Sequence, residues 1–468
     1  MDNDPQVAEL LEELTEFLAL NPKTGWLDVL LVDMNGIVRG KRYPRSEMEK
    51  VFRNGIQLPV SSYFLDVTGR CLDPLGRGYS DGDPDAGCYP LPGTLAAVPW
   101  LHRPGAQVLI SMPADRGLIV DPRAHAQRQV QALEALGYDA FTAFEVEFML
   151  LDPKSRDCRR ALLAASELTG RVETLGQVYR MDEIEATEKL LDAIAGACRI
   201  QSIPASVISS EYACGQFEIN LQHVPDPVTA ADHCVLFKRL IRSVARQQGY
   251  EACFMAKPFR DDSGNGLHTH MSLMDSTGVN IFAGGHGQDG GQDGGQDGSQ
   301  GSERLLHAVG GLLRSLPEAM ALYAPNVNSF RRFKPGTFVP VGKTWGYNNR
   351  SVAVRIPDSE PQARRFEFRA PGADANPYLV LTGILAGVIH GLTQQLDPGP
   401  PATGNISEEV DPGMPLRWQP AIEALAQSDL FARAFGPEYL QLYCETKRLE
   451  AESFHDHISD REYEWYMF

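Results

Sequence analysis

The chain has 468 residues, a hydrophobic fraction of 43% and a formal net charge of -18 at pH 7. So acidic a chain is a poor partner for nucleic acid, and none is predicted. No apolar run approaches the roughly 18 residues of a membrane span, and the acidic N-terminus lacks the features of a secretory signal, so no membrane partner is expected. Eight scattered cysteines without a CxxC pair favour a cytoplasmic location.

The first part of the chain predicts a helix followed by a small, mostly β domain. Residues 5–18 place apolar side chains at helical spacing, within an N-terminal helical segment 1–23. Two β-rich runs flank Asn35-Gly36, which is a strong signal for a β-hairpin. Residues 24–119 are therefore assigned to one domain, with further short strands expected at residues 96–100 and 107–112.

Residues 120–468 predict a larger unit in which helices are interspersed with strands. Helical patterns occur at residues 122–136, 182–200, 228–248, 303–323, 377–396 and 437–458. Residues 284–301 repeat Gly-Gln-Asp-Gly three times, and this low complexity predicts an exposed insertion. The chain ends in an aromatic tail around Trp465, which is either part of the core or an anchor for a neighbouring subunit.

Two glutamates share one face of the strand predicted at residues 141–151. Successive side chains of a strand alternate between its faces, so Glu145 and Glu147 lie together opposite an apolar face. Neighbouring carboxylates repel each other unless both face water or a cation lies between them. This segment alone leaves open a solvated outer face of a sheet and a cation site.

Three more predicted strands combine an apolar face with reactive polar side chains, at residues 216–221, 267–273 and 365–369. Their polar faces, with one residue shortly before the first strand, supply Glu211, Glu218, His268, His270, Ser272 and Glu367. A lone His-x-His pair is more often structural, but four such strands favour a shared site. A site rich in carboxylates suits Mg²⁺ or Mn²⁺ better than zinc.

A cluster of positive charge follows these acidic segments. Residues 328–357 contain Arg331, Arg332, Lys334, Lys343, Arg350 and Arg355. Divalent ions and guanidinium groups together stabilise phosphoryl transfer from a nucleotide. A basic patch for an acidic partner is the alternative. The sequence has neither the Walker phosphate loop nor the motifs of protein kinases, so those nucleotide-binding folds are not expected.

Six segments resemble, in order and spacing, the signature segments of the glutamine synthetase superfamily. They are EVEF at 145–148, EYACGQFEINL at 211–221, GNGLHTHMSL at 264–273, NSFRRFKPG at 328–336, NNRSVAVRIP at 348–357 and RRFEFRAPGADANPYL at 364–379. The resemblance implies an α+β fold, with a β-grasp-like N-terminal domain and a catalytic domain whose antiparallel sheet or open barrel is flanked by helices. It also implies a ligase that phosphorylates the γ-carboxylate of glutamate with ATP, in a homo-oligomer, usually a dodecamer, with active sites between subunits.

The resemblance assigns a role to each matched residue. Two ions, Mg²⁺ or Mn²⁺, would be held by Glu147, Glu211 and Glu218 and by Glu145, His268 and Glu367. Glutamate would bind at Gly264, Arg332 and Arg369. The nucleotide would contact His270, Ser272, Arg350 and Arg355. Arg350 and Arg355 would face the transferred phosphoryl group and the nucleotide phosphates. Arg350 and the metal ligand Glu367 are the candidates for catalytic roles.

Two departures from the superfamily pattern concern the binding site of the amine substrate. Members that use ammonia carry a glutamate in the loop after Pro-Gly, where this chain has Phe338. They also carry an Asp-Gly-Ser-Ser loop in the N-terminal domain, and residues 59–64 lack it. Losing two carboxylates and gaining aromatic surface disfavours ammonium and favours a longer amine that contacts Phe338.

Residues 82–100 and 342–350 resemble the γ-glutamylpolyamine, or γ-glutamylputrescine, synthetase branch, which implies a role in polyamine metabolism. Ammonia-dependent glutamine synthesis is the alternative activity. A catalytically silent structural relative is a third reading, disfavoured because all six metal positions are present. Residues 397–415 contain no tyrosine, so adenylylation of that loop is not expected.

Overall fold

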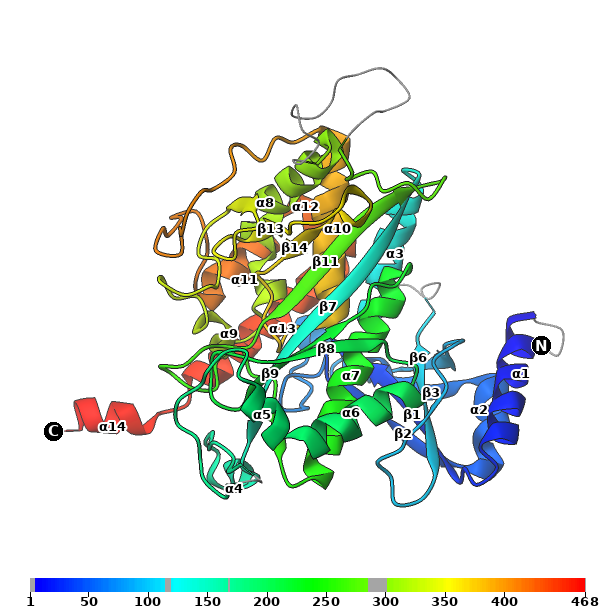
Figure 1. Ribbon diagram of the computed structural model, residues 1–468. Coiled ribbons are helices and arrows are strands. Elements are labelled where there is room, and N and C mark those ends of the chain that lie inside the picture. Colours follow the sequence, from blue (N-terminus) through cyan, green and yellow to red (C-terminus); the bar gives the residue numbers. More distant parts are fainter. Residues whose placement is uncertain (1–4, 114–118, 167–168, 285–300, 468) are drawn as a thin grey trace.

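The computed structural model describes residues 5–113, 119–166, 169–284 and 301–467. Most of the low-complexity insertion predicted at 284–301 lies outside the described residues. The described chain is an α+β structure with two β-sheets (Figure 1). All strands of the first sheet precede residue 112, and all strands of the second follow residue 137.

The first sheet contains the predicted hairpin. It comprises β1 (Trp26–Val32), β2 (Val38–Pro44), β3 (Ile56–Pro59), β4 (Asp85–Pro90), β5 (Ala96–Ala97) and β6 (Gly105–Ser111). β1 pairs antiparallel with β2 and parallel with β6, which confirms the hairpin and the strand within residues 107–112. The strand expected at residues 96–100 is only two residues long.

The second sheet is mostly antiparallel and runs through the middle of the molecule. Its eight strands are β7 (Tyr138–Leu151), β8 (Ala205–Ser210), β9 (Gln216–Leu221), β10 (Glu251–Cys253), β11 (Leu267–Asp275), β12 (Trp345–Tyr347), β13 (Val354–Ile356) and β14 (Phe366–Phe368). Their order is β12-β13-β14-β11-β7-β9-β8, with β10 paired to the end of β7. The sheet therefore brings together segments separated by two hundred residues of sequence.

Helices cover the apolar face of this sheet. The described α-helices are α1 (Pro5–Leu20), α2 (Met48–Asn54), α3 (Pro122–Glu134), α4 (Lys154–Cys158), α5 (Met181–Ala186), α6 (Glu188–Ile200), α7 (Pro227–Gln247), α8 (Glu303–Tyr323), α9 (Val327–Phe330), α10 (Pro377–Gln394), α11 (Trp418–Ala426), α12 (Asp429–Phe435), α13 (Pro437–His455) and α14 (Asp460–Tyr466). α3 and α7 contact β7. Tyr323 of α8 places its ring 5.0 Å from that of Phe368 on β14. The buried side of the sheet is thus fixed by packing, which leaves the polar side for chemistry.

One expectation about apolar segments needs correction. α10 is long and apolar enough to span a bilayer, but 72% of it is buried inside the structure, where it packs against α3, α7 and α8. A β-carbon on Gly311 of α8 would lie 2.1 Å from the carbonyl oxygen of Gly387 on α10, so the two helices meet at close range. The apolar character of α10 is explained by its place in the core.

Three predicted elements differ in their bounds. The helix predicted at 182–200 is interrupted at Thr187, whose hydroxyl donates to the carbonyl oxygen of Glu183. Such a bond competes with regular helix geometry. The strand predicted at residues 141–151 begins already at Tyr138. The helix predicted at 437–458 ends at His455, and α14 continues separately, away from the body of the molecule (Figure 1).

Candidate active site

The four polar-faced strands are neighbours in the second sheet. Glu145 of β7 lies opposite His268 of β11, and Glu147 lies opposite Glu218 of β9. His270 of β11 lies opposite Glu367 of β14. Directly opposed side chains in an antiparallel pair lie about 5 Å apart at their β-carbons. The strand register therefore gathers these carboxylates and imidazoles on one face.

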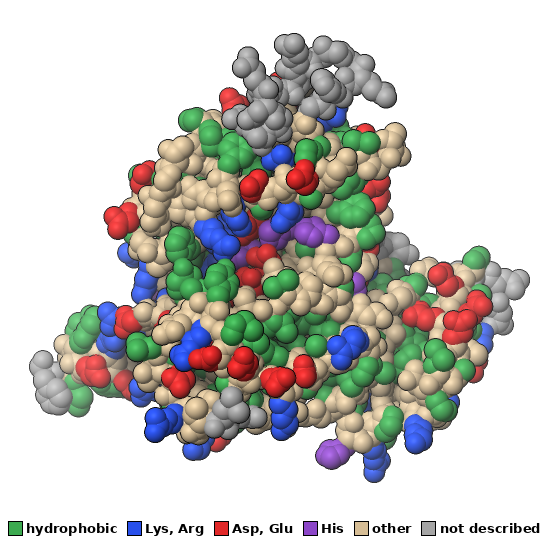
Figure 2. Space-filling view, in the orientation of Figure 1, with side chains coloured by type: hydrophobic (Ala, Val, Ile, Leu, Met, Phe, Trp, Pro, Cys, Tyr) green, Lys and Arg blue, Asp and Glu red, His purple; other side chains and the backbone are tan. Residues whose placement is uncertain are grey.

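His268 is at the centre of this carboxylate cluster. Its Nδ1 lies 3.3 Å from Glu145, 3.9 Å from Glu218 and 3.8 Å from Glu367, and its Nε2 lies 3.8 Å from Glu147. Histidine and acidic side chains gather in a hollow in the middle of the molecular face, with basic side chains beside them (Figure 2). The charged groups are thus recessed but accessible from solvent.

The pKa values of the carboxylates in the cluster are shifted in opposite directions. Burial, together with repulsion from Glu145 and Glu147, raises the pKa of Glu218 well above its ordinary value. Burial and the charge of Glu147 raise the pKa of Glu211 to about 7. Hydrogen bonds with His268 and His270 outweigh burial and lower the pKa of Glu145. Two of these acids therefore lack sufficient positive charge nearby.

This shortage of positive charge fits divalent cations. Two sets of residues could each hold an ion, because the donor atoms within each set lie within 4.8 Å of one another. One set is Glu145, Glu218 and His268, and the other is Glu145, His270 and Glu367. Carboxylate oxygens with one imidazole suit Mg²⁺ or Mn²⁺. The resemblance assigns His270 to the nucleotide, whereas the geometry also places it within reach of an ion. Glu147 and Glu211, both predicted as ligands, belong to neither set. The Glu211 carboxylate lies 3.4 Å from the Ser209 hydroxyl.

Arginines adjoin the other side of the cluster. Glu367 is buried and forms ion pairs with Arg369 and, at 2.7 Å, with Arg355. Although burial opposes it, the charge of Arg369 and then of the two histidines lowers the pKa of Glu367 to about 2. Arg350 is exposed, and the nearby Tyr179, Glu367 and Glu218 raise its pKa.

Arg332 is buried next to the segment that carries Gly264. Its guanidinium donates to the carbonyl oxygens of Ala370, at 2.8 Å, and Arg369, and burial lowers its pKa to about 10. A β-carbon on Gly264 would lie 2.3 Å from the carbonyl oxygen of Ala256 and 3.1 Å from the Arg332 side chain. Only glycine fits there, so the backbone packs against the aliphatic part of the Arg332 side chain.

Two further predicted residues lie at the edge of the cluster. Ser272 is buried on β11, two residues after His270 and on the same face. Phe338 lies outside the regular elements, in the loop after Gly336, with 49% of its side chain exposed. Neither belongs to the two candidate metal sets of the described residues.

Polar partners of the cluster were not assigned roles from sequence. The Gln216 amide donates to Glu147, at 3.2 Å, and to the carbonyl oxygen of Gly264, at 3.0 Å. Asn220 donates to Glu145 at 2.8 Å. Both lie on the polar face of β9, so strand alternation is the signal that could have found them. They fix the rotamers of the two glutamates from the β9 side.

Arg365 orients His270. Its Nε donates to His270 Nδ1 at 3.1 Å, and His270 Nε2 lies 2.9 Å from Glu145. Because Nδ1 accepts a hydrogen bond, we assign the proton of the neutral ring to Nε2, the atom nearest the Glu145 carboxylate. The imidazole is therefore held between a cation and a carboxylate.

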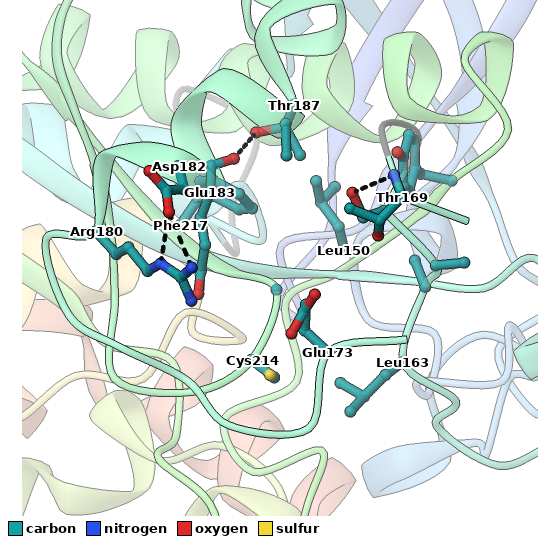
Figure 3. Close-up of a pocket in the computed structure, with 16 residues that line it drawn as sticks. Leu150, Leu163, Thr169, Glu173, Arg180, Asp182, Glu183, Thr187, Cys214 and Phe217 are labelled. Atoms are coloured by element: carbon teal, nitrogen blue, oxygen red, sulfur yellow. Dashed lines mark hydrogen bonds and ion pairs between the residues drawn. The ribbon is translucent and has the colours of Figure 1, made fainter. Parts of the chain in front are cut away.

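A separate cavity lies on the opposite face of β7 and β9. It has a volume of about 240 Å³, and Leu150, Phe217 and Cys214 are among its lining residues (Figure 3). Leu150 and Phe217 alternate with the polar residues of their strands and so point away from the carboxylate cluster. Arg180 at its edge is already paired with Asp182 at 2.9 Å. The cavity is therefore distinct from the site described above.

Comparison with known proteins identifies the family. The profile described as "Glutamine synthetase, catalytic domain" matches residues 119–466. The chain belongs to the glutamine synthetase family. One relative, the gamma-glutamylputrescine synthetase PuuA of Escherichia coli, is 36% identical over 97% of this chain and 94% of its own length. The glutamate–isopropylamine ligase of a Pseudomonas species is 29% identical over 93% of both chains.

Other family relatives differ in the amine that their names give. The gamma-glutamylethanolamide synthetase of Streptomyces coelicolor is 30% identical over 97% of this chain and 94% of its own length. A solved structure titled "Apo GmaS without ligand" matches 96% of this chain and 98% of that chain, with a TM-score of 0.81 and 25% identity. The glutamine synthetase-type α+β fold is thereby confirmed.

Proposed function

We propose that this glutamine synthetase family member joins the γ-carboxylate of glutamate to a primary amine larger than ammonia. One glutamate oxygen attacks the terminal phosphorus of ATP and ADP leaves. The amine nitrogen then attacks the acyl carbon, phosphate leaves, and the nitrogen loses a proton. The observation that supports this proposal best is a carboxylate–imidazole cluster that forms ion pairs with buried arginines on one face of the sheet.

The acidic and the basic residues of the site would have different roles in this reaction. Glu145, Glu147, Glu211, Glu218, His268 and Glu367 would hold Mg²⁺ or Mn²⁺. Bound there, such ions would neutralise the phosphates of ATP. His270, Ser272 and Arg355 would contact the nucleotide, and Arg350 would face the transferred group because its side chain is exposed toward the cluster. Gly264, Arg332 and Arg369 would bind glutamate, because a buried guanidinium pairs well with a carboxylate.

The amine is argued from Phe338. Its half-exposed ring stands where ammonia-using relatives of this family are expected to carry a glutamate. A phenyl ring cannot accept a proton from ammonium, but it can pack against methylene groups or the face of a cation. The three relatives described above are named for putrescine, isopropylamine and ethanolamide. We therefore favour a polyamine such as putrescine.

The test measures phosphate release with glutamate, ATP and Mg²⁺ in the presence of ammonium, putrescine, isopropylamine or ethanolamine. Mass spectrometry of the product should show one γ-glutamyl group on the preferred amine. A higher kcat/KM for ammonium than for every larger amine would refute the amine assignment and support glutamine synthesis, the activity for which relatives at 28% identity are named. Failure to release phosphate with any amine would support the silent structural relative instead.

We further propose a homo-oligomer of twelve subunits and a cytoplasmic location. Tyr463, Trp465 and Tyr466 are 53%, 63% and 75% exposed, so the aromatic tail is not part of this chain's core. An exposed aromatic tail on a helix that leaves the body (Figure 1) suits contact with another subunit. All eight cysteines, which fall within the described residues, are free. Light scattering of the full chain and of a chain ending at Ser459 would test the assembly, which should weaken on truncation.

A further inference from the structure

A pair of aromatic rings stands beside the charged site. Tyr212 and Phe338 have ring centroids 6.2 Å apart at an interplanar angle of 37°. Their side chains are 53% and 49% exposed. Two large rings that contact each other without being buried are poorly explained by the packing of the core.

The segments that carry these rings belong to the two halves of the site. Tyr212 directly follows Glu211, whose pKa is raised by Glu147 and Glu145. Phe338 lies six residues after Arg332, which is buried beside Gly264. The aromatic pair therefore joins the metal side of the site to the side proposed for glutamate, where the amine must reach the acyl carbon.

The backbone of Tyr212 is held firmly while its ring is free. The Glu211 amide donates to the carbonyl oxygen of Gln216, and the Ala213 amide donates to the Gln216 side chain. A β-carbon on Gly176 would lie only 2.1 Å from the Tyr212 carbonyl oxygen, so that segment packs directly on the turn. A ring on a fixed backbone costs little additional entropy when a ligand binds.

The loop that carries Phe338 is also braced. The Gly336 amide donates to the carbonyl oxygen of Ser407 at 3.0 Å, and the Asp411 amide donates to that of Val341 at 3.1 Å. Both ends of the loop are thereby attached to residues 397–415. The two rings form a wall presented by two fixed backbones.

We infer that Tyr212 is a specificity-determining residue that, with Phe338, packs against the alkyl chain of the amine. This inference rests on the proposed function. Ammonia has no apolar surface to bury on such a wall, whereas each methylene group that leaves water contributes to binding. A second ammonium group at the far end of a diamine would gain further from the face of a ring.

The test compares the selectivity of Tyr212→Ala, Tyr212→Phe and the parent enzyme. The readout is the ratio of kcat/KM for butylamine to kcat/KM for hydroxylamine, a nucleophile without an alkyl chain. We expect Tyr212→Ala to lower this ratio at least tenfold and Tyr212→Phe to change it less than threefold, because phenylalanine keeps the ring. A larger loss with putrescine than with butylamine would add a contact with the second ammonium group, whereas equal losses assign packing of the chain alone.

An unchanged ratio in Tyr212→Ala would overturn the inference. If the ratio is unchanged because both rates fall equally, the role of Tyr212 is structural. Circular dichroism and ADP binding check that each variant is folded. Failure of the proposed function itself would look different, because the parent enzyme would then form neither the hydroxamate from hydroxylamine nor a γ-glutamyl amine.

Discussion

Replacing Glu367 by glutamine tests whether attraction or repulsion dominates in the charged site. The pKa of Glu367 is lowered from 4.5 to about 2, chiefly by Arg369 and the neighbouring histidines against the cost of burial. A lowered pKa stabilises the fold above the ordinary pKa, and this contribution is lost as the pH falls through about 2. At neutral pH the full contribution is present, roughly 3 kcal/mol for a shift of this size. Glu367→Gln should therefore destabilise the metal-free protein by that amount.

The assay is urea unfolding at pH 7.5 in EDTA, followed by circular dichroism. Glu49→Gln is the matched control, because Glu49 also pairs with an arginine, Arg53 at 2.9 Å, but on the exposed surface of α2. Exposed pairs of this kind contribute about 0.5 kcal/mol or less. Greater stability of Glu367→Gln in EDTA would refute the reasoning, since it would show that repulsion from Glu145 exceeds the attraction of the arginines.

Three further predictions concern the amine, the core and the pH dependence. Phe338→Glu should raise the ratio of kcat/KM for ammonium to that for butylamine about tenfold, because a carboxylate binds a small cation and accepts its proton; an unchanged ratio would contradict the role of this loop. Lys447 and Glu450 form a fully buried ion pair at 2.8 Å, so Lys447→Met should cost about 3 to 5 kcal/mol and the double variant Lys447→Met, Glu450→Gln less, as measured by urea unfolding. Equal costs would show that the charge left behind carries no penalty. Burial raises the pKa of Asp33 from 3.8 to about 6, so its stabilising contribution is lost as the pH rises through this range. The melting temperature of Asp33→Asn should accordingly rise relative to that of the parent between about pH 4 and pH 8, and a constant difference would rule out this titration.

Strand alternation alone located most of the carboxylate cluster. It placed Glu145 and Glu147 together, and it gave His268 and His270 a common face, because the period of a strand depends only on local geometry. The Asn-Gly turn signal between two β-rich runs predicted the hairpin around Asn35-Gly36, now seen as β1 and β2. Site residues that share one face of a single strand were therefore predictable from the sequence of that strand.

The pairing of residues on neighbouring strands could not be predicted from the alternation within each strand. Nothing in residues 141–151 or 267–273 states that Glu145 faces His268, since that pairing depends on the register of β7 and β11. The interruption at Thr187, where the backbone leaves helical geometry with φ -116°, is not reported by periodicity. The resemblance to known family members, rather than periodicity, supplied the assignment of each residue to a metal, nucleotide or substrate.

The placement of the site suggests how one scaffold serves different amines. Apart from Glu211, the carboxylates, the histidines and Arg355 lie on paired strands, where a change of register would displace every side chain to the other face. Tyr212 and Phe338 instead lie in connections between elements, where substitution leaves the register intact. Phosphoryl transfer therefore depends on the rigid sheet, whereas the choice of amine depends on two loops. Exchanging only residues 212 and 338 should then alter amine selectivity and leave the affinity for ATP, measured by calorimetry, within about threefold; a loss of ATP affinity would show that the loops and the sheet are energetically coupled.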